Sequence, residues 1–199
     1  MERVEIIPGL IVDEEMYEHA VHGLEHHAPG EKLTWEAFTD ERSWLLIPDP
    51  DGAGYKGELV VRREEVRTIK INLWMAPDLR AGATPAPHNH PWVFRAHVLM
   101  GGYTERRYQV LDGKVHTETR SHTAGGENYV PLDVFHEVTR IHAPARTLTL
   151  MVCGEGRKGN WGYLDVATGA FEENPADPTF KARLLALNPR LRLHDVSGS

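Results

Sequence analysis

The sequence predicts an all-β protein whose centre is an antiparallel barrel or jelly roll, with a helical extension before it and a helix after it. Three observations support this fold class. From residue 66 onward, short strand-like segments are separated by turn signals roughly every 8–12 residues. Before that point, residues 13–28 have the periodicity of an amphipathic helix, and a second helical pattern follows at 177–187.

The N-terminal part is expected to be an extension packed on the barrel. Asp13 is placed to cap the helix at 13–28. One face of that helix collects its apolar residues, namely Met16, Tyr17, Ala20, Val21 and Leu24. Pro29-Gly30 then ends it. Residues 48–57, rich in Pro, Asp and Gly, are expected to form a loop, and 59–62 a short strand.

The barrel strands begin with residues 66–74, whose alternation places Ile69, Ile71 and Leu73 on one face. A Pro/Gly/Ala-rich connection follows at 77–87. Further strands are predicted at 93–100, 103–111, 114–121, 129–131, 136–141, 147–152 and 161–165. Pro178 fits the first turn of the last helix. We expect one domain in three parts, which are the extension at 1–65, the barrel at 66–172, and the C-terminal helix and tail at 173–199.

The composition excludes several classes of partner. The chain has 199 residues and a formal net charge of −7, and its basic residues are scattered, so no basic stripe for nucleic acid is expected. No apolar run approaches the ~20 residues of a transmembrane helix, which argues against a membrane protein. Cys153 is the single cysteine, which excludes an intramolecular disulfide and favours a cytoplasmic location.

Three histidines are the best candidates for a metal site. His88 and His90 are spaced i, i+2, which places both imidazoles on the same face of a strand. Imidazole is a common metal ligand, and His136, near the start of a later strand, is the best third ligand. The alternative is a pair of exposed histidines on a loop beside prolines.

Two groups of residues recur in a characteristic order. The first contains Gly82, His88, His90 and Gly101. The second contains Gly125, Pro131 and His136. Over residues 66–153 they resemble the two signature motifs of the cupin superfamily, which implies the cupin double-stranded β-helix, a jelly-roll barrel. Four segments together are also similar to a little-characterised cupin group, which implies no particular activity; they are 90–92, 101–105, 147–152 and 159–163.

The sequence departs from the cupin pattern at one point. In cupins a glutamate usually stands four or five residues after the second histidine. These two positions hold Phe94 and Arg95 here, and neither side chain binds a metal. The remaining three-histidine pattern is similar to that of thiol dioxygenases, which implies iron(II) and dioxygen. Three neutral ligands leave the charge of the metal uncompensated and so favour an anionic substrate. Zinc, nickel and manganese stay open as alternative metals.

Other residues are candidates around this site. Glu105 and Tyr103 share a strand face, and we expect them to be catalytic if that face lines the barrel. The alternatives for Glu105 are a metal ligand, a partner that orients one of the histidines, and a solvent-facing glutamate. The alternative for Tyr103 is a packing tyrosine. The candidate substrate-binding residues are Trp92, Phe94, Lys70 and Asn72. Lys70 and Asn72 either line the barrel or face outward, and the apolar face opposite them favours the outward orientation.

Three functions remain open from the sequence. The leading hypothesis is a cupin oxygenase or dioxygenase that oxidises a small anionic molecule at a three-histidine iron(II) site. The second is a redox-neutral lyase, isomerase or hydrolase with zinc or nickel at the same residues. The third is a non-catalytic module that binds a small molecule. The resemblance to cupins also implies a homodimer as one assembly.

Overall fold

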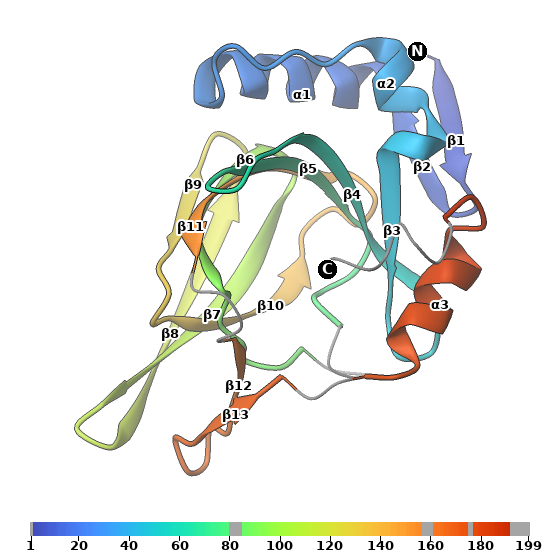
Figure 1. The fold of residues 1–199 in the computed structure, drawn as a ribbon. Helices are drawn as coiled ribbons and strands as arrows, with labels where there is room; N and C mark the ends of the chain where they lie inside the picture. The colour runs from blue at the N-terminus through green and yellow to red at the C-terminus, as the bar shows by residue number, and fades with distance from the viewer. Residues whose placement is uncertain (1, 80–84, 157–160, 175–176, 192–199) are drawn as a thin grey trace.

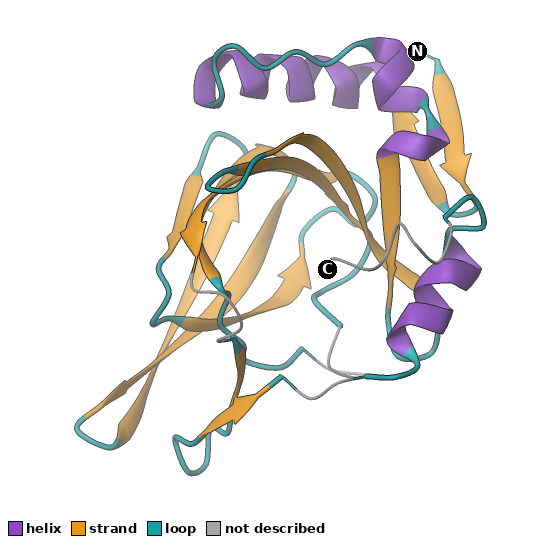
Figure 2. Cartoon of the chain, in the orientation of Figure 1, coloured by secondary structure: helices purple, strands orange, loops and turns teal. Residues whose placement is uncertain are grey.

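The computed structural model describes residues 2–79, 85–156, 161–174 and 177–191. An antiparallel barrel forms its centre, and the helices lie outside the barrel (Figure 2). The predicted all-β class with helices at both ends is therefore confirmed. Gly82 and the tail from residue 192 lie outside the described residues.

The N-terminal layer begins with a hairpin that the sequence did not predict. The hairpin is formed by β1 (Arg3–Ile7) and β2 (Leu10–Asp13). The rest of this layer consists of α1 (Glu14–His27), α2 (Trp35–Thr39) and the 3-10 helix η1 (Glu41–Ser43). The helix predicted at 13–28 is confirmed as α1, and the Asp13 side chain caps it by accepting a hydrogen bond from the Met16 N–H at 3.0 Å. In Figure 1, α1 lies across the outer face of the larger sheet.

The larger sheet has six antiparallel strands in the order β3-β4-β5-β11-β6-β9. Their bounds are β3 (Trp44–Pro48), β4 (Gly54–Arg63), β5 (Thr68–Trp74), β6 (Trp92–Met100), β9 (Glu127–Val130) and β11 (Thr147–Gly156). The long loop expected at 48–57 is wrong, because β3 and β4 form a hairpin that turns at residues 49–53. The sheet also continues across the boundary expected at residue 66, since β4 pairs with β5.

The smaller sheet closes the barrel with three strands in the order β10-β7-β8. Their bounds are β7 (Gly102–Leu111), β8 (Lys114–Thr123) and β10 (Phe135–Ile141). A separate pair, β12 (Gly162–Leu164) and β13 (Phe171–Glu173), lies below the barrel in Figure 1. Gly101 has φ +69° at the turn between β6 and β7, and a Cβ there would approach the Thr147 hydroxyl to 2.5 Å, so the glycine is required.

The C-terminal helix α3 (Phe180–Leu187) confirms the helix predicted at 177–187, although it begins three residues later. It ends at Asn188, whose wholly buried side chain joins the helix to β3. The Asn188 amide accepts from the Leu46 N–H and donates to the Leu46 carbonyl, each at 2.8 Å. Within the described part of the chain, no helix is long and apolar enough to cross a membrane.

Asn188→Ala is expected to lower the free energy of unfolding by about 2–3 kcal/mol, because both main-chain groups of Leu46 lose a buried partner. Urea unfolding followed by circular dichroism measures this change. A loss below about 0.5 kcal/mol, the range of an ordinary surface substitution, would show that the amide does not hold α3 to the sheet.

Candidate metal centre

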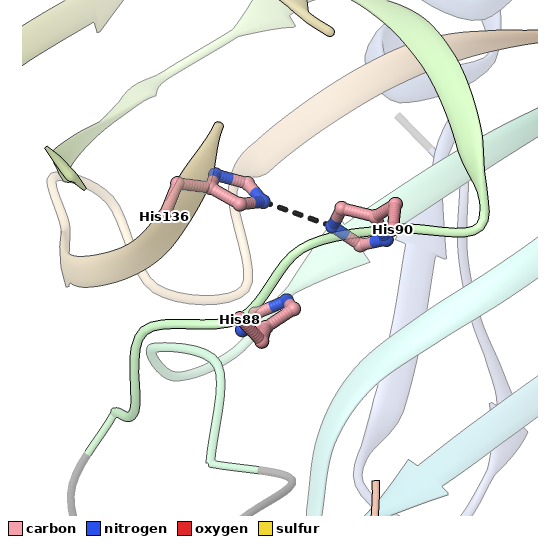
Figure 3. A group of neighbouring side chains, drawn as sticks. All are labelled: His88, His90 and His136. Carbon is pink, nitrogen blue, oxygen red and sulfur yellow. Dashed lines mark hydrogen bonds between the residues drawn. The ribbon is translucent and has the colours of Figure 1, made fainter. Parts of the chain in front are cut away.

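The three predicted histidines lie together inside the barrel (Figure 3). One ring nitrogen from each of His88, His90 and His136 lies within 4.8 Å of the other two. The Nε2 atoms of His90 and His136 are 2.9 Å apart. Two nitrogens that bind one ion at ~2.1 Å and at right angles are about 3 Å apart, so this pair has the spacing of adjacent ligands.

Backbone pairing explains how residues so far apart in sequence meet. His88 and His136 exchange two main-chain hydrogen bonds, of 2.9 and 2.8 Å, so the segment before β6 runs beside the start of β10. Although residues 88–90 precede β6, their side chains alternate in direction as they would in a strand, so His88 and His90 point to the same side. Asn89 points the other way, and its side-chain oxygen accepts from the Gly162 N–H at 2.8 Å.

Hydrogen bonds to the far nitrogens orient two of the rings. His88 Nδ1 lies 2.9 Å from the Ala86 carbonyl, and His136 Nδ1 lies 3.0 Å from Glu105 Oε2. A carbonyl and a carboxylate accept hydrogen bonds, so each Nδ1 carries the proton and each Nε2 keeps its lone pair for a metal. Burial lowers the pKa of His88 to about 4 and, with the neighbouring histidines, that of His90 well below its usual value. Both rings are therefore neutral at pH 7, the form that binds metals.

Glu105 lies behind the histidines and does not belong to the group of converging ligands. It is wholly buried on β7, which rules out the solvent-facing alternative. Its carboxylate accepts from His136, from His122 at 3.0 Å, from Arg107 at 2.6 Å and from Asn128 at 2.9 Å. Burial raises the pKa of Glu105, but the hydrogen bonds from His122 and His136 and the charge of Arg107 outweigh it and hold that pKa well below its usual range. Glu105 is thus placed to position His136.

Tyr103 also faces the barrel interior, as the shared strand face with Glu105 implied. Its ring stacks on Trp74 at 6.5 Å between centroids, and its hydroxyl accepts from Asn128 at 2.8 Å. Burial raises the pKa of the hydroxyl. In the described part of the chain this hydroxyl meets Asn128 rather than a converging histidine, so the geometry favours the packing alternative.

The outward orientation favoured for Lys70 and Asn72 is wrong. Ile69, Ile71 and Leu73 pack in the core beneath the N-terminal layer, on the outside of the barrel. The opposite face of β5 therefore turns into the barrel, where Asn72 is 2% exposed. An apolar strand face marks burial but does not say which of two layers buries it.

Two aromatic residues form a wall beside the histidines. The Phe94 ring meets the His90 ring edge to face, with centroids 4.9 Å apart, and the Trp92 ring lies 6.3 Å from His90. Arg95, whose parity is opposite to that of Phe94, is exposed and pairs with Glu127. The structure thus keeps the arginine away from the metal ligands.

Several interior residues were missed from the sequence. Asp78 lies in the connection after β5, with a carboxylate oxygen 3.7 Å from His88 Nε2, and no pattern marked it. Arg107 shares the strand face of Glu105, and that parity was a usable signal. Lys56 lies in the first part of β4, which was expected to be a loop, and Glu58 lies just before the short strand expected at 59–62.

Comparisons with known proteins give only distant similarity. No protein-family model matches the sequence, and no curated protein matches it. Similar solved structures include an RmlC-like cupin from Shewanella frigidimarina, at 15% identity, covering 57% of this chain and 86% of that chain with a TM-score of 0.39. They also include the cupin domain of Schizosaccharomyces pombe Cnp3, at 12% identity, covering 50% and 64% with a TM-score of 0.38.

A third similar structure is Streptomyces albus HEPD with 2-hydroxyethylphosphonate and Fe(II) bound. It is 16% identical, and the match covers 59% of this chain and 25% of that chain with a TM-score of 0.42. The similarity to these three structures is one of fold, and each match covers 50–59% of this chain.

Proposed function

We propose that this protein is an enzyme that uses iron(II), held by His88, His90 and His136, to oxidise a small anionic molecule with dioxygen. The observation that carries the proposal is the convergence of three ring nitrogens within 4.8 Å of one another, from two buried histidines and one partly buried histidine. When bound, iron(II) supplies open coordination positions at which a substrate and dioxygen are activated side by side.

The donor set fits a divalent cation and favours an anionic partner. Three neutral imidazoles contribute no charge, and the nearby Asp78 carboxylate lies 3.7 Å from His88 Nε2. One carboxylate leaves part of a dipositive charge uncompensated, so an anion gains free energy on entering the barrel. Phe94 and Trp92 limit the access of water, which strengthens these electrostatic interactions.

Nitric oxide distinguishes the iron hypothesis from its alternatives without knowledge of the substrate. Anaerobic protein loaded with iron(II) is expected to give a high-spin iron–nitrosyl signal in electron paramagnetic resonance, because nitric oxide occupies the position proposed for dioxygen. His90→Ala protein is the control and is expected to give no such protein-bound signal. Wild-type protein that binds zinc or nickel tightly but gives no nitrosyl signal with iron would favour the redox-neutral enzyme.

The proposal extends to location and assembly. A cytoplasmic location is proposed because Cys153 is the single cysteine of the sequence, so that no intramolecular disulfide forms. A homodimer remains a proposal, and sedimentation velocity is the measurement that tests it.

A further inference from the structure

A cluster of three charged side chains lines the barrel near the histidines. Lys56 and Glu58 come from β4 and Lys70 from β5. Glu58 lies 3.0 Å from the Lys56 ammonium and 3.3 Å from that of Lys70. Each side chain is only 14–16% exposed. Two cations and one anion leave this cluster with one excess positive charge, which is costly in a poorly solvated place.

Two uncharged polar atoms in the same region have no hydrogen-bond partner among the described residues. The amide oxygen of Asn72 and the indole N–H of Trp92 are buried, and no atom in the described part of the chain hydrogen-bonds to either. Leaving such groups unpaired costs about 1–3 kcal/mol each. The Asn72 oxygen therefore needs a hydrogen-bond donor, and the Trp92 N–H needs an acceptor.

The charged cluster and the unpaired atoms lie along one path to the histidines. Lys70 and Asn72 share the interior face of β5, and the Lys70 ammonium lies 5.8 Å from the centre of the Trp92 ring. The Trp92 ring is in turn 6.3 Å from His90. A molecule of a few heavy atoms that meets the lysines and Trp92 therefore also approaches the metal position.

We propose that the barrel binds a small monocarboxylate that carries a hydroxyl group. The carboxylate accepts from the Lys70 and Lys56 ammonium groups and from the Trp92 N–H, while the hydroxyl donates to the Asn72 oxygen. A single negative charge offsets the excess positive charge of the three side chains Lys56, Lys70 and Glu58, and the nearby Asp78 carboxylate lies against His88. A hydroxyl suits Asn72 better than an ammonium, which the lysines would repel. This inference deepens the proposed function by naming the substrate class of the same site.

Calorimetric titration with matched compounds tests the inference. The probes are glycolate, lactate and 2-hydroxybutyrate. Acetate, propionate and butyrate lack the hydroxyl, and ethylene glycol, propane-1,2-diol and butane-1,2-diol lack the charge. At least one hydroxy acid is expected to bind about tenfold or more tightly than both of its matched compounds. The diols lose the charge-assisted hydrogen bonds to the lysines, and the simple carboxylates leave the buried Asn72 oxygen unpaired, and each loss costs about that much.

Substitutions assign the two parts of the ligand. Lys70→Met is expected to weaken binding of the hydroxy acid about tenfold or more, and Asn72→Leu is expected to abolish the preference for the hydroxyl. Lys114→Met, at the exposed start of β8, is the matched control and is expected to bind like wild type. Thermal melting checks that each variant folds, and Asn72→Asp provides a second, polar variant that repels the carboxylate.

Titrations of metal-free and zinc-loaded protein separate this inference from the proposed function. Binding that needs Lys70 and Asn72 in either form supports the inference even if iron chemistry is absent. If no hydroxy acid binds, or if the variants bind it like wild type, the inference is wrong, and water fills the site instead. A protein that binds iron(II) and nitric oxide but none of the hydroxy acids retains the proposed function and loses only this substrate class.

Discussion

His90→Ala protein is expected to lose its bound metal, whereas wild type is expected to be purified with close to one equivalent. The ring of His90 meets His88, His136 and two aromatic rings but takes no part in the Glu105 network. Its removal therefore deletes one of three ligands while the fold is retained. Removing a ligand is expected to cost more than the 10–100-fold in affinity that is typical of a lost supporting contact.

Elemental analysis and a competitive titration with a chromophoric chelator measure this effect. His116→Ala is the matched control, since His116 is exposed on β8 and is expected to leave the metal content unchanged. Full metal occupancy in His90→Ala protein with a wild-type melting temperature would contradict the three-histidine site.

Glu105→Gln is expected to affect both stability and metal binding. The substitution keeps the shape of the side chain but removes the negative charge that faces buried Arg107, which is 7% exposed. Breaking a buried ion pair by removing one partner typically costs about 3–5 kcal/mol. His136 also loses the carboxylate that holds its Nδ1 proton, and metal affinity is expected to fall about 10–100-fold.

Urea unfolding and the same chelator titration give the two readouts separately. The matched control is Glu118→Gln, on the exposed surface of β8, which is expected to change neither quantity appreciably. Unchanged metal affinity in a destabilised Glu105→Gln protein would limit Glu105 to a structural role. Unchanged stability would show that Arg107 finds another partner.

The sequence was most informative where local pattern and chemistry coincide. Strand alternation and glycine turns were sufficient to predict the barrel, since successive side chains of a strand point to opposite faces whichever strands lie beside it. The cap at Asp13 and the apolar stripe of α1 were equally local. The histidines could be grouped because His88 and His90 share a strand face, and because their order with Gly101, Pro131 and His136 resembles the cupin motifs.

The sequence was least informative where both faces of a strand are buried. In β3 apolar residues occupy both faces, so no alternation marked it as a strand of the main sheet. The Glu105 network joins β7, β8, β9 and β10, and its members become neighbours only when the sheets close. Parity placed Glu105 and Tyr103 on one face, but it could not say which partners they would meet.

The sequence by itself determined the barrel class, its flanking helices and the identity of three converging histidines. Only the tertiary structure decided which way β5 faces. Its apolar side contacts the N-terminal layer, so Lys70 and Asn72 point inward. The physical reason is that alternation records which side chains avoid water, whereas the layer that covers them is fixed by segments distant in the sequence.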